Sequence, residues 1–355
     1  MAIALPLAAA FSLSFLFTPA MLRVATKFSL LDYADNRKVH IGAKPYLGGV
    51  AIFLTCALCT MMFFPWDSKT FIFLGGGIFY FLLGLVDDRY NIPARLKFLM
   101  ELLVTIVVVW QGIRNGLFLE NPFGRVGAIP LLAYLSLPFS VLWIVGIANA
   151  VNLIDGLDGL AAGVVMIACV AMGVASLINP AVLLNPYTII LFGCMAGFIP
   201  YNLYPSKILM GDSGSLFIGY SVAIISLSSF ANSDRSVFLS LIPPAMALFI
   251  PISDTMMAIC RRSLKGVGIF SPDKGHFHHL LLRRGYSHPK AVWIVWGISA
   301  GFGSLSLILS KLIIKQIYLV LAMLFVAVVW AITSYGILAK YSPTEPPEHQ
   351  HPYSQ

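Results

Sequence analysis

The sequence predicts an all-α polytopic membrane protein with about eleven transmembrane helices. Of the 355 residues, 59% are hydrophobic and only 11% are charged, whereas soluble domains carry about 25% charged residues. Apolar stretches of about 17 residues or more recur from one end of the chain to the other, and a helix of that length crosses a bilayer. Because these stretches are continuous and do not alternate with polar residues, they do not fit a transmembrane β-barrel.

The apolar stretches locate the expected spans in chain order. The first one, MAIALPLAAAFSLSFLFTPAML, lacks a basic n-region and is too long for a signal h-region, so we expect a retained span. Residues 1–340 are expected to form one integral-membrane domain, and the polar, Pro-rich residues 341–355 a disordered tail. The expected spans are residues 2–22, 47–64, 70–86, 96–112, 128–148, 157–178, 183–200, 214–231, 237–259, 291–310 and 316–338.

The basic residues predict the orientation of these spans. Of the 23 Lys and Arg, 17 fall in loops on one side of the membrane and 6 on the other. The positive-inside rule then puts the N-terminus outside and the C-terminus in the cytoplasm of a plasma-membrane (inner-membrane) protein. The net charge of +8 therefore reflects topology in a lipid bilayer, and we expect no nucleic-acid partner.

Polar side chains that are expensive inside a bilayer gather at the cytoplasmic ends of the spans. Asp87 and Asp88 end one span in GLVDDR. Two acids at a helix C-terminus oppose the helix dipole, so a cation or a catalytic role explains them better than a solvated turn with an Asp88–Arg89 pair.

The stretch NLIDGLDGL places three oxygen-bearing side chains between two spans. Asn152, Asp155 and Asp158 are spaced i, i+3, i+6, which puts them roughly on one face if the segment is helical. Asp155 as a helix cap, with Asp158 near the positive helix end, is the alternative. A cap needs only one such residue, however, and carboxylate and amide oxygens suit Mg²⁺.

Two further motifs point to phosphate chemistry. In MGDSGS, Asp212 opens a span beside backbone N–H groups that could hold phosphate oxygens, with an N-cap as the alternative. In the longest cytoplasmic loop, HFHH follows RRSLKG, a set suited to a polyphosphate unless the loop is merely solvated.

Two acids inside spans have simpler explanations. Lys97 and Glu101 are spaced i, i+4 and could form an ion pair. Asp254 could pair with Arg261 or Arg262, which follow it by seven and eight residues.

Taken in order, these motifs resemble the polyprenyl-phosphate N-acetylhexosamine-1-phosphate transferase family, glycosyltransferase family 4. The motifs are DNRKVHIGAKPYLGG, GLVDDR, ARLKF, NAVNLIDGLDGLAAG, PYNLYPSKILMGDSGSLFIGY, PISDT and SPDKGHFHHLLLRRG, and they extend over residues 32–285. The H-x-H-H form is similar to the undecaprenyl-phosphate N-acetylglucosamine-1-phosphate branch. Phe277 departs from the three consecutive histidines of the muramoyl-pentapeptide branch.

The resemblance implies transfer of an N-acetylhexosamine-1-phosphate, for this branch N-acetylglucosamine-1-phosphate, from a UDP-sugar to a polyprenyl phosphate such as undecaprenyl phosphate. UMP is released, and the reaction is the first membrane step of cell-envelope polysaccharide synthesis. The resemblance implies a requirement for Mg²⁺, which Mn²⁺ could replace. It leaves open whether the protein forms a homodimer. By position it assigns catalytic acids, metal ligands and substrate contacts. The catalytic acids are Asp87, Asp88 and Asp155; the metal ligands are Asn152 and Asp212; the substrate contacts are Lys97, Asp158, Arg262, His276, His278 and His279.

Two alternatives stay open. The first is the same reaction with a different UDP-N-acetyl sugar. The second is a cation-coupled transporter, whose site would lie near the bilayer midplane in matching halves of the chain. The candidate acids instead lie near one face, and the sequence shows no internal repeat.

Overall fold

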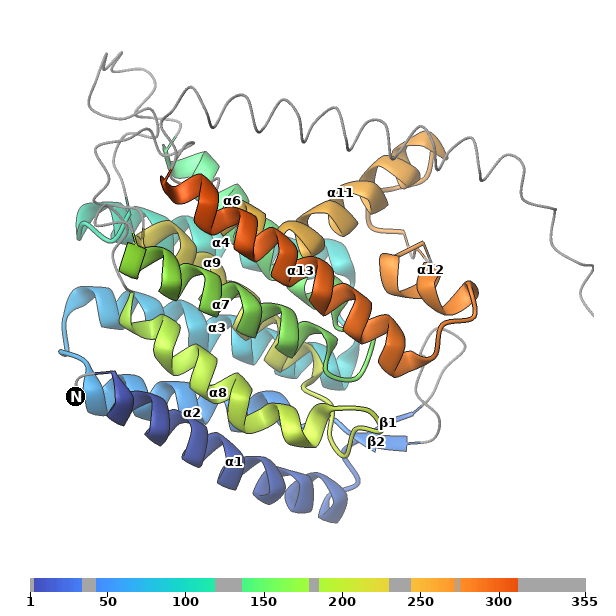
Figure 1. The fold of residues 1–355 in the computed structure, drawn as a ribbon, viewed down its shortest axis with the longest axis horizontal. Coiled ribbons are helices and arrows are strands. Elements are labelled where there is room, and N and C mark those ends of the chain that lie inside the picture. The colour runs from blue at the N-terminus through green and yellow to red at the C-terminus, as the bar shows by residue number, and fades with distance from the viewer. Residues whose placement is uncertain are drawn as a thin grey trace, which may run out of the picture. The chain divides into compact units, whose positions relative to one another are not determined.

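The computed structural model describes residues 3–33, 43–118, 136–178, 185–229, 244–271, 273 and 275–311. These residues form helices and one short pair of strands (Figure 1). The helices are α1 Ala4–Lys27, α2 Gly48–Phe63, α3 Ser68–Tyr90, α4 Ala94–Arg114, α6 Ser136–Ile154, α7 Leu160–Ile178, α8 Pro186–Asn202, α9 Gly211–Ser229, α11 Phe249–Leu264, α12 Phe277–Arg283 and α13 His288–Lys311. The strands are β1 Leu31–Tyr33 and β2 Ala43–Pro45.

The helices confirm the all-α, multi-pass architecture. Ten of the eleven expected spans overlap with helices among the described residues. Within those residues, six helices are long and apolar enough to cross a membrane, namely α1, α3, α4, α6, α7 and α13, and α2 is a shorter apolar helix. The span expected at 316–338 and the tail at 341–355 lie outside the described residues. The total of eleven spans and their orientation therefore stay predictions.

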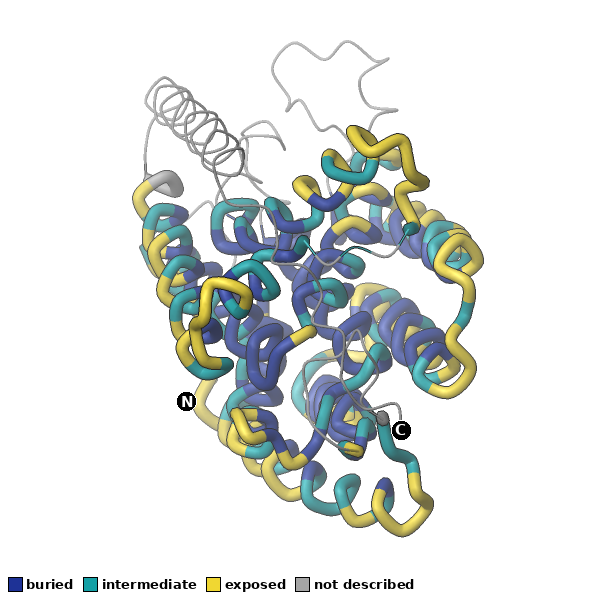
Figure 2. The backbone as a smooth tube through the Cα atoms, turned by 90° about the vertical axis from the view of Figure 1, so that its right-hand side faces the viewer, coloured by how far each residue is buried: buried dark blue, intermediate teal, exposed yellow. Residues whose placement is uncertain are grey.

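Helix α9 forms the centre of the bundle. Every residue from Ser213 to Ser229 is buried, and α9 packs against α2, α3, α6, α7 and α8. Figure 2 shows this arrangement as buried segments inside and exposed segments at the periphery. The outer helices expose apolar side chains such as Leu16, Leu103 and Trp293, as expected for surfaces that face lipid.

The N-terminus of α9 is packed closely by glycines from two other helices. A Cβ atom on Gly49 of α2 or on Gly84 of α3 would clash with the backbone of residues 212–214. Gly211 itself has a φ of +71°, a left-handed conformation that favours glycine. The position of Asp212 is therefore set by backbone packing as well as by its own side chain.

Two local details differ from the expectation. Helix α6 ends at Ile154, so Asp155 and Asp158 lie in the turn before α7 and do not continue a helical face. Gly159, with a φ of +81°, closes that turn. The antiparallel pair β1–β2 was not expected. Pro45 accepts a backbone hydrogen bond from Leu209, which brings the strand pair beside the start of α9.

Candidate active site

A cavity of about 640 Å³ opens where several helices end. Its wall includes six aspartates, from β1, the end of α3, the α6–α7 turn and the start of α9. The aspartates are Asp32, Asp87, Asp88, Asp155, Asp158 and Asp212, and His279 and His288 lie in the same wall. The structure therefore gathers most of the predicted site residues around one cavity.

Asp212 is held by side chains from three different helices. Asn152 of α6 donates to its Oδ1 at 2.7 Å. Lys97 of α4 donates to its Oδ2 at 3.2 Å. Asp88 of α3 accepts from its backbone N–H at 2.7 Å. The Asp212 side chain is still 40% exposed, so its carboxylate can also contact a ligand in the cavity.

Asp88 caps helix α9 from a different part of the chain. Its Oδ1 accepts from the N–H of Asp212 at 2.7 Å, and its Oδ2 accepts from the N–H of Ser213 at 3.1 Å. A carboxylate at a helix N-terminus is favoured by the helix dipole and satisfies otherwise unpaired N–H groups. The expectation that these amides hold phosphate oxygens is therefore wrong for Asp212 and Ser213, whose N–H groups donate to Asp88.

Asp87 and Lys97 form a buried ion pair. The Nζ of Lys97 lies 2.6 Å from Oδ2 of Asp87, and Oδ1 of Asp87 accepts from the N–H of Ile92 at 2.6 Å. Lys97 therefore lies between two carboxylates, those of Asp87 and Asp212. The alternative Lys97–Glu101 ion pair is not formed, since the Lys97 ammonium pairs with Asp87 and Asp212, and Glu101 instead accepts a hydrogen bond from Asn149.

Asp155 differs from the other aspartates of the wall. No hydrogen bond to its carboxylate is present among the residues that the structure describes. Burial and the nearby charges of Asp212, Asp88 and Asp158 raise the pKa of Asp155 well above its usual value. A bound cation would offset this concentration of negative charge.

Asp158 is already paired in the structure. Its Oδ2 lies 2.8 Å from Nζ of Lys44 and accepts from the N–H of Ser206 at 3.0 Å. Burial alone would raise the pKa of Asp158, but the bonds from Lys44 and Ser206 outweigh it and the pKa is lowered. The backbone N–H of Asp158 donates to Nε2 of His288 at 3.2 Å. Lys44, Ser206 and His288 were not predicted, because single residues far apart in the sequence gave no motif of their own.

The three histidines of HFHH occupy different places. His276 pairs through Nδ1 with Oδ2 of Asp254 at 2.9 Å, so Asp254 does not pair with Arg261 or Arg262. His278 is buried against Gly156, and burial together with His279 lowers the pKa of His278 to about 3. His278 is therefore neutral at physiological pH. His279 alone of the three lines the cavity.

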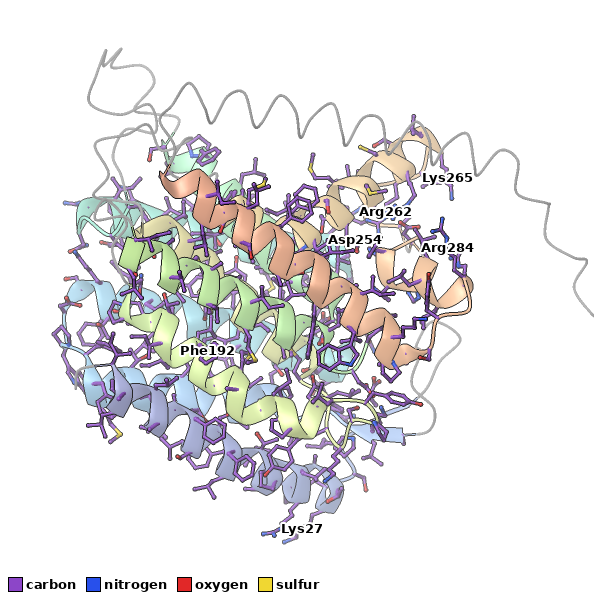
Figure 3. All side chains as sticks on the ribbon, viewed as in Figure 1. Lys27, Phe192, Asp254, Arg262, Lys265 and Arg284 are labelled. Carbon is purple, nitrogen blue, oxygen red and sulfur yellow. The ribbon has the colours of Figure 1, made fainter. Side chains whose placement is uncertain are left out.

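Arg262 lies apart from the cavity. Its Nη1 donates to the carbonyl of Ile269 at 2.6 Å, within the segment that follows α11. Figure 3 shows Arg262 and Lys265 at the α11 end of the molecule. The neighbouring Arg261 binds Asp273 at 2.6 Å. The structure thus brings together the predicted acids, Lys97, Asn152 and His279, but not Arg262.

The oxygen atoms of the cavity wall could bind Mg²⁺ together with water and substrate, but they do not form a complete metal site by themselves. No group of three or more His, Cys, Asp or Glu within the described ranges is close enough to hold a metal ion. Mg²⁺, however, usually keeps several waters and binds one or two carboxylates together with substrate phosphates. Asp212, with Asn152 beside it and the unpartnered carboxylate of Asp155 nearby, suits that mode of binding.

Fold and site together define a multi-pass membrane protein with an acidic cavity where its helices end. Residues 70–230 match the sequence model of Glycosyl transferase family 4. The chain is 37% identical over 317 residues to "Probable undecaprenyl-phosphate N-acetylglucosaminyl 1-phosphate transferase" of Bacillus subtilis, covering 89% of this chain and 86% of the relative. It is 34% identical to "Decaprenyl-phosphate N-acetylglucosaminephosphotransferase" of Mycobacterium tuberculosis, over 80% of this chain and 77% of the relative.

The chain is also similar to a relative from the muramoyl-pentapeptide branch. The chain is 32% identical to "Phospho-N-acetylmuramoyl-pentapeptide-transferase" of Caldanaerobacter subterraneus, over 76% of this chain and 86% of the relative. The chain therefore belongs to glycosyl transferase family 4. It is a membrane transferase of that family.

Proposed function

We propose that the protein transfers N-acetylglucosamine-1-phosphate from UDP-N-acetylglucosamine to undecaprenyl phosphate, or a similar polyprenyl phosphate, and releases UMP. The observation that carries this proposal is the arrangement around Asp212. A lysine and an asparagine contact its two carboxylate oxygens at the wall of an acidic cavity. Relatives named as undecaprenyl-phosphate and decaprenyl-phosphate N-acetylglucosamine phosphate transferases are similar over most of the chain.

The position of the cavity suits two substrates of different solubility. A polyprenyl phosphate stays in the bilayer, whereas a UDP-sugar arrives from water. A cavity at the ends of apolar helices lies where both can reach it. The basic asymmetry of the loops supports a site on the cytoplasmic face of the plasma membrane.

In the proposed reaction an oxygen of the acceptor phosphate attacks the phosphorus that carries the sugar. The bond from that phosphorus to the bridging oxygen breaks, and UMP leaves with the bridging oxygen. Lys97, placed between Asp87 and Asp212, would contact phosphate oxygens as charge develops on them. The buried ammonium suits this role because a low-dielectric environment strengthens its interaction with an anion.

The two adjacent aspartates divide their work in this proposal. Asp87 accepts the proton of the acceptor phosphate, whose second pKa lies near 6 by analogy with phosphoserine. For that, its Oδ2 must exchange Lys97 for the substrate. Asp88 keeps Asp212 in place by capping α9. Asp155 is the second candidate for a direct acid–base or nucleophilic role, since its carboxylate faces the cavity.

Asp212 and Asn152 would hold Mg²⁺, or Mn²⁺ in its place, with Asp155 nearby. The ion, when bound, supplies positive charge that offsets the diphosphate. His279 in the cavity wall and Asp158 beside Lys44 would contact the sugar diphosphate and the nucleotide. His276, His278 and Arg262 would act indirectly, by positioning the α12 helix that carries His279, because none of the three lines the cavity.

The proposal is tested with a panel of UDP-sugars, undecaprenyl phosphate and detergent-solubilised protein. We expect UMP release with UDP-N-acetylglucosamine, abolished by a chelator and restored by Mg²⁺. Release with only another UDP-N-acetyl sugar would support the alternative donor. If no donor releases UMP and the protein in liposomes drives cation-dependent uptake, the transporter alternative replaces the proposal.

A further inference from the structure

A buried polar contact joins α4 and α6, one helical turn from the two residues, Lys97 and Asn152, that contact Asp212. Glu101 of α4 accepts a hydrogen bond from the side-chain amide of Asn149 of α6. Glu101 is fully buried, with 0% exposure. Its other carboxyl oxygen, Oε1, has no hydrogen-bond partner in the described part of the chain. A buried carboxyl group with one unpartnered oxygen destabilises the fold, so we expect Glu101 to contribute to the active site.

The contact has a simple geometric relation to the site. Lys97 precedes Glu101 by four residues on α4, and Asn152 follows Asn149 by three residues on α6. Residues three or four apart lie on the same face of a helix. Glu101 and Asn149 are therefore on the faces that also carry Lys97 and Asn152, about 4.5–6 Å further along each helix axis.

Both helices deliver a side chain to the same carboxylate. Lys97 donates to Oδ2 of Asp212 at 3.2 Å, and Asn152 donates to Oδ1 at 2.7 Å. A slide of α4 along α6 by about 1 Å would take one of these contacts beyond hydrogen-bond range. The alignment of the two helices thus decides whether Lys97 and Asn152 can meet at Asp212.

We propose that Glu101 is a positioning residue, which acts through Asn149 to hold α4 and α6 in the alignment that brings Lys97 and Asn152 to Asp212. Glu101 does not line the cavity, and its partner belongs to the next helix. Its contribution is therefore geometric. Glu101 would thus support catalysis from outside the cavity. The kinetic test of this role rests on the proposed function.

The kinetic test compares two substitutions of Glu101 with a matched control. Glu101→Leu removes the acceptor for Asn149, and we expect kcat to fall about 10- to 100-fold, as for other residues that orient catalytic groups, with a smaller change in the KM for the UDP-sugar. Glu101→Gln keeps a carbonyl oxygen for Asn149 and should retain most of kcat. The control is Thr105→Val, one turn further along α4, which breaks a buried bond of 2.7 Å to Tyr80 of α3. It should leave kcat at the native level.

A cross-linking measurement tests the proposal without any turnover. Lys97→Cys and Asn152→Cys are combined in a chain whose five native cysteines are replaced by alanine, and a short bifunctional methanethiosulfonate is added to membranes. We expect efficient cross-linking, a several-fold lower yield when Glu101→Leu is added, and an unchanged yield with Thr105→Val.

The outcomes separate this inference from the proposed function. Equal cross-linking yields with and without Glu101→Leu would overturn the positioning role, as would native kcat in Glu101→Leu or equal loss in Glu101→Gln. If the native protein releases no UMP while the yield still depends on Glu101, the proposed function fails and the positioning role stands.

Discussion

Removal of the Asp88 carboxylate would leave the start of α9 without its cap. In Asp88→Ala the N–H groups of Asp212 and Ser213 lose acceptors at 2.7 and 3.1 Å. A hydrogen bond to a charged group contributes about 1.5–3 kcal/mol, and loss of a helix N-cap costs about 0.5–2 kcal/mol. Because one carboxylate makes both bonds, we expect the free energy of unfolding to fall by about 2–4 kcal/mol.

The N-cap of α3, which does not line the cavity, provides the control. Asp67 caps the N-terminus of α3 by accepting from the N–H of Thr70 at 2.9 Å, and Asp67→Ala should cost about 1 kcal/mol. Unfolding in detergent is measured together with UMP release under conditions where each variant is folded. Asp88→Ala should lower stability and turnover, because Asp212 is displaced, whereas Asp67→Ala should lower stability only. Asp88→Asn keeps one acceptor oxygen and should lie between native protein and Asp88→Ala.

Two results would contradict the role of Asp88 as the cap of α9. Native stability of Asp88→Ala would show that the two hydrogen bonds contribute nothing to α9. Loss of turnover at unchanged stability would assign Asp88 to the substrate and not to the helix cap.

Four further predictions follow from the site and the topology. Asp212→Asn should abolish UMP release with folding retained, and Asn152→Ala should lower UMP release to a smaller extent, because the lost amide is neutral. Near-native turnover of Asp212→Asn at ordinary Mg²⁺ would rule out Asp212 as a metal ligand. Asp87→Asn should depress turnover more than nucleotide affinity, with partial rescue as the pH rises through about 6–7, where the acceptor phosphate loses its second proton; lost UDP-sugar affinity without rescue would place Asp87 in substrate binding. The Lys44–Asp158 pair lowers the pKa of Asp158, so the pair stabilises the fold above the ordinary pKa of 3.8 and this stabilisation is lost as the pH falls through the lowered pKa. Lys44→Met should therefore lower the free energy of unfolding at neutral pH but not in acid. A loss of stability that persists in acid would exclude the ion pair as its cause. A reporter fused to the C-terminus should be active in the cytoplasm, and activity only outside the cell would contradict the orientation.

The positions of the helices could be predicted because their signal is local. A bilayer requires long apolar stretches, and α1, α4 and α13 lie where such stretches occur. Helix ends were less predictable, since they depend on neighbours. The Asn152–Asp158 segment has helical spacing, yet α6 stops at Ile154 and Gly159 adopts a left-handed turn.

The acids of the site could be predicted because charged groups in membrane helices are costly and few. Their partners could not, because the contacts join distant parts of the chain. Asp88 and Asp212 are 124 residues apart, and Lys44 and Asp158 are 114 residues apart. Similarly, the local spacing of Lys97 and Glu101 favours an ion pair. In the structure the Lys97 ammonium pairs with Asp87 and Asp212, and Glu101 accepts a hydrogen bond from Asn149.

In the proposed function, Asp212 and its neighbours transfer a sugar phosphate onto a polyprenyl phosphate. Mass spectrometry of the lipid fraction tests it most directly, after purified protein is incubated with UDP-N-acetylglucosamine, undecaprenyl phosphate and Mg²⁺. We expect undecaprenyl diphosphate carrying one N-acetylglucosamine, formed in step with UMP by the native protein and absent with Asp212→Asn. Unchanged undecaprenyl phosphate with the folded native protein, or equal product with Asp212→Asn, would contradict it.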